Sequence, residues 1–402
     1  MKKLFYIVTF LFFCTGCSAE ISNSDSTIPE ILPFIISSGF VNEPLESSDI
    51  LSLSCYNGTA TAILKDGSIV LWGSNVFAGI GNGEIDVGNP GTPVNPYRHD
   101  FGRPILETGS MTSSYALTFD GELYMWGENL YNETGIEYAP ILTPTKIELD
   151  FTVAQVSIMP AFTLLLTDMG EVYHAGFPIE TLDRFDDYEH NNENVSKVNK
   201  QFKKLELDFL CQKIDSSVTS YVFLTLEGEV YIQGVLMGDV HREADDLVFN
   251  SPTLIDFPER IVDIAALATN TVAVSESGSV YVFGRPNAGL SDESVDELID
   301  EFIYKKELDF PVESVQGTES IAVIVGKNGM AYSWGVDWDG LIEGSAESEN
   351  NANYNIISTP VNLGYTNVSN IVIGVYTGAV ITGDGDVKMW GNNLIGQVLE
   401  FN

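Results

Sequence analysis

The residue types that perform most enzymatic chemistry are sparse in this sequence. The 402 residues include four His and four Cys against 57 Asp and Glu, and the spacings GxSxG, HExxH and the P-loop are absent. Two carboxylates facing each other across a cleft would suit glycoside hydrolysis, yet no spacing in the sequence singles out such a pair. We therefore interpret the acids as a solvated surface and predict a protein that is not an enzyme and holds no cofactor.

Two short acidic segments contain oxygen ligands of the kind that Ca²⁺ prefers. They are residues 337–340 followed by Glu343, and residues 384–386. A calcium loop needs six or more oxygen ligands, and Asp337 and Gly340 fall where a repeated turn requires a polar residue and a glycine. Turn geometry explains these residues, and no metal site is predicted.

The first residues have the properties of an export signal. Two lysines precede an apolar run of ten residues from 4 to 13, about half the length of a membrane-spanning helix. The following Cys14-Thr15-Gly16-Cys17 resembles the lipobox of bacterial lipoproteins, although Cys14 stands where leucine is usual. The resemblance implies a signal peptide over residues 1–16, a lipidated Cys17 and a flexible tether to residue 32, on a protein of the bacterial cell envelope. The alternative is a free extracellular or periplasmic protein.

The charge balance limits the classes of partner. Nineteen basic residues against 57 acidic ones give a net charge of −38, and removal of residues 1–16 would leave −40. Nucleic acids gain most of their affinity from Lys and Arg contacts to phosphate, so nucleic acid is excluded as a partner. Anionic lipids would also be repelled, so the membrane would hold the chain only through its acyl anchor.

One sequence unit occurs seven times after residue 33. It consists of a glycine, five residues that are mostly apolar and a second glycine, and the copies end at Gly73, Gly127, Gly176, Gly234, Gly284, Gly335 and Gly391. Alternating apolar residues joined by Asp-Gly or Ser-Gly are typical of β-hairpins, so each unit is predicted to be a small antiparallel sheet. Residues 33–402 divide into seven units of about 53 residues. We predict an all-β, seven-bladed propeller, closed by an N-terminal strand that completes the last blade.

The details of the unit resemble the RCC1 repeat. The segment from Ala116 to Asn129, ALTFDGELYMWGEN, and the segment from Trp390 to Val398, WGNNLIGQV, follow its pattern closely. The resemblance implies a seven-bladed propeller over residues 33–402. The histidine that usually precedes the ALT strand is missing here, and the nucleotide exchange and chromatin binding of the nuclear member do not suit an exported acidic protein. Secreted bacterial proteins with this repeat include a β-lactamase inhibitor that docks its top face on the enzyme, which is a further alternative for function.

Aromatic residues in the turn after each unit are the candidate contacts with a partner. Four tryptophans share one repeat position and are predicted to be core residues: Trp72, Trp126, Trp334 and Trp390. Trp338 lies instead in the turn, and Phe77 and Tyr131 occupy its next position in the first two blades. With the neighbouring Asp337 and Asp339, these residues are the predicted binding residues for a protein partner. The alternatives are packing within the same blade, or carbohydrate binding by aromatic and acidic residues at the propeller axis.

The long connections carry much of the charge. Residues 291–302 contain six acids, and their apolar residues have helical spacing after a capping box, so a short helix is predicted there. Residues 177–204 contain the basic cluster Lys197, Lys200, Lys203 and Lys204. If these loops function, acidic loops favour a basic protein partner; ordinary solvation or adaptation to a saline habitat are the alternatives. We expect a monomer in which Cys55 and Cys211 are buried thiols.

Overall fold

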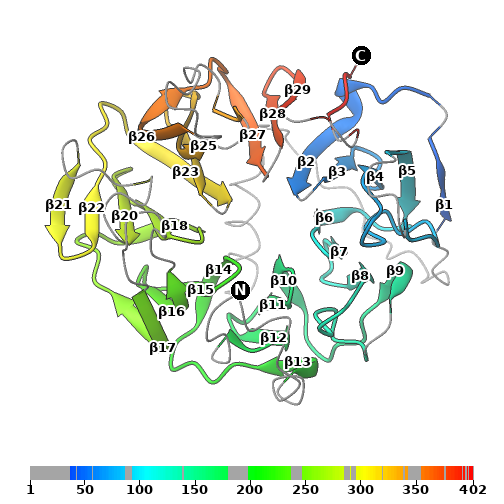
Figure 1. Ribbon diagram of the computed structural model, residues 1–402, viewed down its shortest axis with the longest axis horizontal. Helices are drawn as coiled ribbons and strands as arrows, with labels where there is room; N and C mark the ends of the chain where they lie inside the picture. Colours follow the sequence, from blue (N-terminus) through cyan, green and yellow to red (C-terminus); the bar gives the residue numbers. More distant parts are fainter. Residues whose placement is uncertain are drawn as a thin grey trace, which may run out of the picture.

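The computed structural model describes most of the chain after residue 36. The described residues are 37–41, 43–56, 58–86, 93–137, 140–179, 198–236, 247–284, 290, 296–318, 320–337, 340–342, 355–374, 377–391, 393, 396 and 398–401. They form seven antiparallel sheets arranged around a central axis (Figure 1), which confirms the predicted seven-bladed, all-β propeller. The signal peptide, Cys17 and the tether lie outside the described residues.

The blades follow one another in chain order, and each sheet runs outward from the axis. Blade 1 contains β1 (Ser37–Phe40), β2 (Ile50–Tyr56), β3 (Thr59–Leu64), β4 (Ile69–Gly73) and β5 (Val94–Asp100), with a 3-10 turn, η1 (Ser47–Asp49), before β2. Blade 2 contains β6 (Ile105–Ser110), β7 (Ser113–Thr118), β8 (Leu123–Gly127) and β9 (Ile141–Lys146). Blade 3 contains β10 (Val153–Met159), β11 (Phe162–Thr167), β12 (Val172–Gly176) and β13 (Asn199–Lys204).

The remaining four blades repeat this plan. Blade 4 contains β14 (Cys211–Ser216), β15 (Ser220–Thr225), β16 (Val230–Leu236) and β17 (Leu247–Ile255). Blade 5 contains β18 (Ile261–Ala266), β19 (Asn270–Ser275), β20 (Val280–Gly284), β21 (Glu297–Asp300) and β22 (Ile303–Lys305). Blade 6 contains β23 (Val312–Thr318), β24 (Ile321–Gly326), β25 (Ala331–Asp337) and β26 (Asn355–Asn362). Blade 7 contains β27 (Val368–Ile373), β28 (Thr377–Thr382) and β29 (Val387–Gly391).

The two glycines of each unit have different structural roles. Gly121, the first glycine in blade 2, has a φ of +82° in the tight turn between β7 and β8, a conformation that a side chain disfavours. Gly127, the second glycine, faces β7 so closely that an added Cβ would lie 2.7 Å from the carbonyl oxygen of Thr112. The register between β8 and β9 shifts beside it. The first glycine therefore allows the turn, and the second allows the blade to twist.

The repeated tryptophans connect neighbouring blades. Trp126 Nε1 donates a hydrogen bond to the carbonyl oxygen of Gly79 in the preceding blade at 2.7 Å. Trp334 and Trp390 donate in the same way to the carbonyls of Leu290 and Leu341, at 3.1 and 2.8 Å. Trp72, Trp126 and Trp334 are fully buried, which confirms three of the predicted core positions, whereas Trp390 is half-buried. Each indole thus fills the space between two blades and caps a turn of its neighbour.

A second aromatic contact anchors the start of several units. The ring of Phe151 stacks on Tyr173 with centroids 4.0 Å apart, and Phe209 stacks on Tyr231 at 4.1 Å. Phe310 and Tyr332 repeat the contact at 4.3 Å. In these three units an aromatic residue that precedes the unit packs on the tyrosine of the unit and fixes the chain as it enters the blade.

The ring closes differently from the prediction. The strand Ser37–Phe40 does not complete blade 7: it pairs with β5 and becomes the outermost strand of blade 1. In the described residues, blade 7 has three strands. Side chains of β2 and β3 instead pack with those of β28 and β29 and with Leu399 and Phe401 in one apolar cluster, and the ring of Phe401 lies 6.3 Å from that of Trp72. Apolar packing therefore joins blades 1 and 7 where a shared sheet was expected.

The helix predicted within residues 291–302 is also wrong in its described part. Residues 297–300 form strand β21, which pairs with β22 at the outer edge of blade 5. Both apolar residues of this strand, Leu298 and Ile299, are exposed, so the helical spacing had no core to face. Pairing with the neighbouring strand β22 therefore outweighed the helical spacing of the local sequence.

The two described cysteines are buried free thiols, as predicted. Cys55 Sγ donates to the carbonyl oxygen of Thr377 across the junction of blades 1 and 7. In the part of the chain that the structure describes, we find no helix with the length and apolarity needed to cross a bilayer.

The tryptophan contacts lead to a prediction about stability. Trp126→Phe removes a buried inter-blade hydrogen bond and leaves a cavity, so we expect the free energy of unfolding to fall by about 2–3 kcal/mol. Trp390→Phe removes the same kind of hydrogen bond at a half-buried site and should cost less. Urea denaturation followed by circular dichroism measures both. Equal losses for the two variants would contradict the role assigned to burial between the blades.

Candidate functional site

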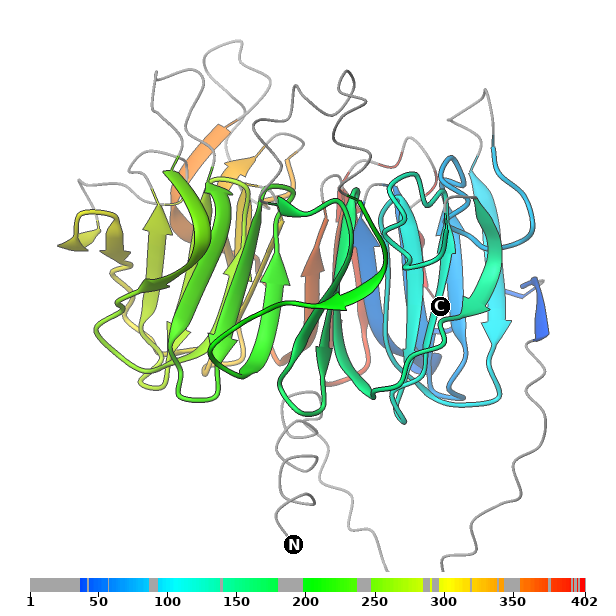
Figure 2. The same ribbon diagram turned by 90° about the horizontal axis from the view of Figure 1, so that it is seen from below.

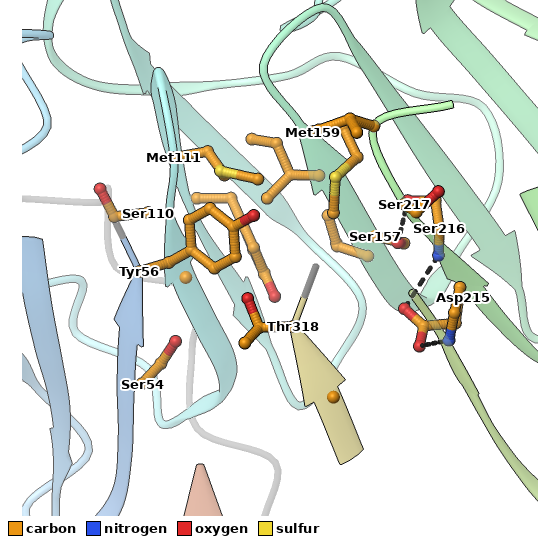
Figure 3. Close-up of a pocket in the computed structure, with 17 residues that line it drawn as sticks. Ser54, Tyr56, Ser110, Met111, Ser157, Met159, Asp215, Ser216, Ser217 and Thr318 are labelled. Atoms are coloured by element: carbon orange, nitrogen blue, oxygen red, sulfur yellow. Dashed lines mark hydrogen bonds between the residues drawn. The ribbon is translucent and has the colours of Figure 1, made fainter. Parts of the chain in front are cut away.

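The innermost strands of the blades surround the axis and enclose a cavity near one end of it. Its volume is about 190 Å³. The lining is rich in hydroxyl groups and also contains two methionines, and Figure 3 shows it with the labelled residues Ser54, Tyr56, Ser110, Met111, Ser157, Met159, Asp215, Ser216, Ser217 and Thr318. These residues come from the ends of the inner strands and the turns that follow them. The cavity is thus built by six blades together, and no single repeat contains it.

Polar side chains below the cavity join neighbouring inner strands. Gln155 donates to the carbonyl oxygen of Ile214 at 2.8 Å and accepts from the backbone N–H of the same residue at 3.0 Å. The Asp215 carboxylate accepts from the N–H of Ala266 at 2.9 Å in the next blade. Asp263 continues the pattern and accepts from the N–H of Val315 at 2.8 Å. Each contact satisfies a backbone group that the neighbouring strand leaves unpaired toward the axis.

One cation lies within this polar ring. Lys213 Nζ forms an ion pair with Asp263 and donates to the carbonyl oxygen of Ile264 at 2.8 Å. Burial alone would lower the pKa of Lys213, but the carboxylates of Asp263 and Asp215 outweigh it and the pKa lies above its usual value. Burial raises the pKa of Asp215, which Lys213 partly offsets. The lysine therefore stays charged and holds the acids of two blades near the axis.

Glu107 on β6 lies beside this polar ring, and its pKa is strongly raised. Its carboxylate accepts a hydrogen bond from the Tyr115 hydroxyl at 2.6 Å. Although part of the side chain is exposed, burial raises the pKa of the carboxyl group to about 7, and the hydrogen bond from Tyr115 only partly counteracts this. Glu107 thus changes charge near neutral pH.

The cavity offers hydrogen bonds to a small polar molecule. The Thr318 hydroxyl lines it and has no hydrogen-bond partner in the described structure, although the residue is only 6 % exposed. Tyr56 and Thr318 project into the open space in Figure 3. Among the described residues, no three His, Cys, Asp or Glu side chains are arranged to hold a metal ion. The chemistry that this lining supports is recognition through hydroxyl groups.

The two faces of the propeller differ in the length of their connections. At one face, which we call the bottom face, the second and third strands of all seven blades are joined by four residues. At the opposite face, the top face, six connections lead from the third strand to the next strand of the blade and contain 10 to 22 residues each. Figure 2 shows the two faces at opposite edges of the ring. The axial cavity lies toward the top face, because its lining follows the ends of the inner strands.

The six top connections are also the most acidic part of the chain. Together they contain 94 residues with 22 acids and four bases, a net charge of −18 out of −38. Less than a quarter of the sequence thus carries nearly half of the negative charge. Long connections on a rigid scaffold are where binding residues concentrate, and this charge would attract a positively charged partner.

Two of the predicted partner contacts lie in turns of the top face and are half-buried. Phe77 belongs to the turn after β4, and Tyr131 to the turn after β8. The Tyr131 ring packs edge-on against Phe177 of blade 3, with centroids 6.4 Å apart, and its backbone N–H donates to Glu133 at 3.0 Å. Part of each side chain faces solvent, while Tyr131 also joins two blades.

Asp337 has a structural role in the corresponding turn of blade 6. Its carboxylate accepts from the N–H of Leu341 at 2.7 Å and of Ile342 at 3.3 Å, and the residue is 2 % exposed. The asparagines at this repeat position do the same: Asn75, Asn129 and Asn393 each accept from the N–H five residues later. Asp337 therefore caps a turn and offers little surface to a partner. Trp338 and Asp339 lie outside the described residues.

The described lysines of the predicted basic cluster also take part in contacts within the protein. Lys200, Lys203 and Lys204 lie on strand β13, and Lys197 lies outside the described residues. Lys204 pairs with Glu171 at 2.7 Å, and Lys200 with Glu137 at 3.4 Å. These exposed pairs belong to the outer edge of blade 3 and do not form a basic patch of their own.

The axial residues were missed by the sequence analysis. Lys213, Asp263 and Glu107 each stand two residues after the start of an inner strand. A polar residue recurring there in every blade is the signal that would have located the axis. The cavity itself has no such signal, because it depends on which strand ends meet.

The architecture defines the class of protein: the chain is an RCC1-like seven-bladed β-propeller. No model of a protein family matches it. Protein pim1 of Schizosaccharomyces pombe is 24 % identical over 363 residues, which cover 81 % of this chain and 66 % of pim1. The human E3 ubiquitin-protein ligase HERC2 is 28 % identical over 271 residues, which cover 63 % of this chain and 5 % of HERC2. The chain thus spans about two thirds of pim1 and a small part of HERC2.

Solved structures agree on the fold. Prp20p from Saccharomyces cerevisiae superposes with a TM-score of 0.61 at 18 % identity, and the match covers 86 % of this chain and 90 % of that one. A likeness at this identity defines the architecture and leaves the activity open.

The position of Glu107 leads to a prediction about pH. The pKa of Glu107 in the folded protein is raised above its ordinary value. Protonation of Glu107 therefore stabilises the folded state fully below about pH 4.5, and this stabilisation is lost as the pH rises through about 7. Glu107→Gln removes this dependence and should be more stable than the natural chain at pH 8 by about 1–2 kcal/mol, with no gain at pH 4.5. Urea denaturation at both pH values measures the difference. Glu137→Gln, at an exposed carboxyl, is the matched control, and a gain that is the same at both pH values would refute the assignment.

Proposed function

We propose that the protein is an extracytoplasmic, lipid-anchored propeller that binds another protein with its top face. The observation that carries the proposal is the asymmetry of the two faces: seven four-residue turns on one and six long acidic connections on the other. An RCC1-like propeller is a fold suited to protein interaction, and the yeast neighbour Prp20p was studied for its binding to Gsp1p and histones. The proposed partner here is a basic protein, since the top connections carry a net charge of −18.

The proposed anchor is a diacylglycerol on Cys17, and the chain would be exported across the cytoplasmic membrane and anchored in the bacterial cell envelope. The supporting observations are the basic start, the ten-residue apolar run and the small residues before Cys17. The proposed role is non-enzymatic and does not include nucleotide exchange. HERC2 is named as a ligase, but the match covers 5 % of it.

The axial cavity favours a second candidate function. Its hydroxyl lining and the unpartnered Thr318 hydroxyl suit a small sugar or other polyol, which corresponds to the carbohydrate-binding alternative. Carbohydrate binding ranks second because the cavity is small compared with the extent of the six top connections. Inhibition of a β-lactamase is a special case of the first proposal, in which the partner is an enzyme.

The anchor is tested by metabolic labelling. A bacterial host that expresses the full chain with an alkyne analogue of palmitate should label the natural protein and the Cys14→Ser variant. Cys17→Ser should lose the label, because Cys17 is the proposed acceptor. Labelling that persists in Cys17→Ser, or its absence from the natural protein, would exclude the anchor.

The partner site is tested by photo-crosslinking from the top face. With p-benzoylphenylalanine at position 77, we expect adducts with a basic protein of the host envelope or culture medium that fall at least fivefold between 50 and 500 mM salt, because exposed charge contacts are screened. Tyr131→Ala with Trp338→Ala should reduce the same adducts. The control site is Leu254, an exposed residue on the outer strand β17. The same adducts from both sites would show that the top face is not the binding face.

A further inference from the structure

The bottom face exposes large apolar side chains on consecutive blades. Phe119 and Met169 occupy the four-residue turns of blades 2 and 3, and Leu210 directly precedes the inner strand of blade 4. Their exposed fractions are 54 %, 62 % and 46 %. Leu51, at the bottom end of β2 in blade 1, is exposed as well. The corresponding turns of blades 5 and 7 have the sequences Glu-Ser-Gly-Ser and Gly-Asp-Gly-Asp, so the exposed apolar residues gather on blades 1–4.

Backbone contacts place these three residues in a continuous row. Gly121, at the end of the Phe119 turn, packs against Thr152, and Thr152 accepts a hydrogen bond from the N–H of Asp168 at 3.1 Å. Gly170, which follows Met169, approaches Leu210 so closely that an added Cβ would lie 3.0 Å from the Leu210 side chain. We call Phe119, Met169 and Leu210 the apolar row.

The chain before residue 37 joins the propeller at this same face. Strand β1 pairs with β5 so that Ser37 lies opposite Asp100, and Asp100 is the end of β5 nearest the bottom face, four residues before β6 begins. If residues 17–36 form the predicted tether, a chain of 20 residues has a mean reach of about 25 Å. An anchor at Cys17 would therefore keep the bottom face near the membrane and leave the top connections directed away from it.

We propose that the apolar row inserts into the surface of the lipid bilayer to which the chain is anchored, and so orients the propeller. This inference rests on the proposed anchor at Cys17. The three side chains come from separate connections of three blades, which suits a deformable lipid surface better than the shaped surface of a protein. We expect the row to contact uncharged lipid headgroups, because anionic headgroups would repel the negatively charged chain.

The neighbouring charges agree with this choice of lipid. Asp120, next to Phe119, is paired with Arg103, so the turn brings little net charge to the surface. Met169 and Leu210 are closely preceded in the sequence by acids, Asp168 and Asp208, and not by basic residues that would attract anionic headgroups. Contact with phosphatidylcholine is therefore expected to exceed contact with phosphatidylglycerol.

The test uses the chain from residue 17 onward, with the Cys17 thiol coupled to a maleimide phospholipid in phosphatidylcholine vesicles. The thiols of Cys55 and Cys211 are buried, so the coupling selects Cys17. The photo-crosslinker p-benzoylphenylalanine replaces Met169 in one sample. In the control it replaces Val248, which is 58 % exposed at the start of β17 near the top face.

The expected result is at least threefold more lipid adduct from position 169 than from position 248. Adding Phe119→Ser and Leu210→Ser should reduce the adduct at position 169 at least threefold, with circular dichroism confirming that the propeller remains folded. Equal adduct at both positions, or no effect of the two serines, would overturn the proposal. Because the anchor is attached chemically, this result is independent of whether a bacterial host acylates Cys17, and the two proposals fail separately.

Discussion

No blade of this propeller can bury its apolar side chains alone. The second strand of each blade is covered on both sides, as in β3 and β7, whose residues are all buried, and the cover comes from the two neighbouring blades. The indole of Trp126 shows how the neighbours are held together: it fills the space between blades 1 and 2 and donates its only hydrogen bond to Gly79. The fold therefore depends on inter-blade packing that is complete only when the ring closes.

Closure is where this chain differs from a simple repetition of its unit. The first strand belongs to blade 1, and blades 1 and 7 are joined by a shared apolar cluster to which Phe401 contributes. A junction made of side chains instead of backbone hydrogen bonds leaves β1 free to follow the outer edge of the ring. It also brings the start of the described chain to the bottom face, opposite the long connections. The position of β1 therefore places the proposed anchor on one side of the propeller and the proposed binding loops on the other.

The axis combines two constraints. The inner strands converge there with backbone groups that lack a neighbouring strand, and side chains such as Gln155 and Asp215 satisfy them across the blade boundaries. The same polar ring raises the pKa of both Glu107 and Lys213, which favours the neutral form of the acid and the charged form of the lysine. Acids concentrated near an axis must either pair, as Asp263 does with Lys213, or take up a proton, as Glu107 does near neutral pH.

The sequence by itself determined the repeat, the number of blades and the identity of most core positions. A glycine that must adopt positive φ, an alternating strand and a tryptophan at a fixed position are local requirements, and they recur wherever the unit does. The pairing partner of the strand Ser37–Phe40 and the strand at residues 297–300 depended on what each segment met in space. The axial cavity and the apolar row on the bottom face likewise consist of residues from different blades, which become neighbours only when the ring has closed. Local conformational preferences are encoded within one repeat, whereas sites between repeats are decided by packing, and for that reason the tertiary structure alone placed them.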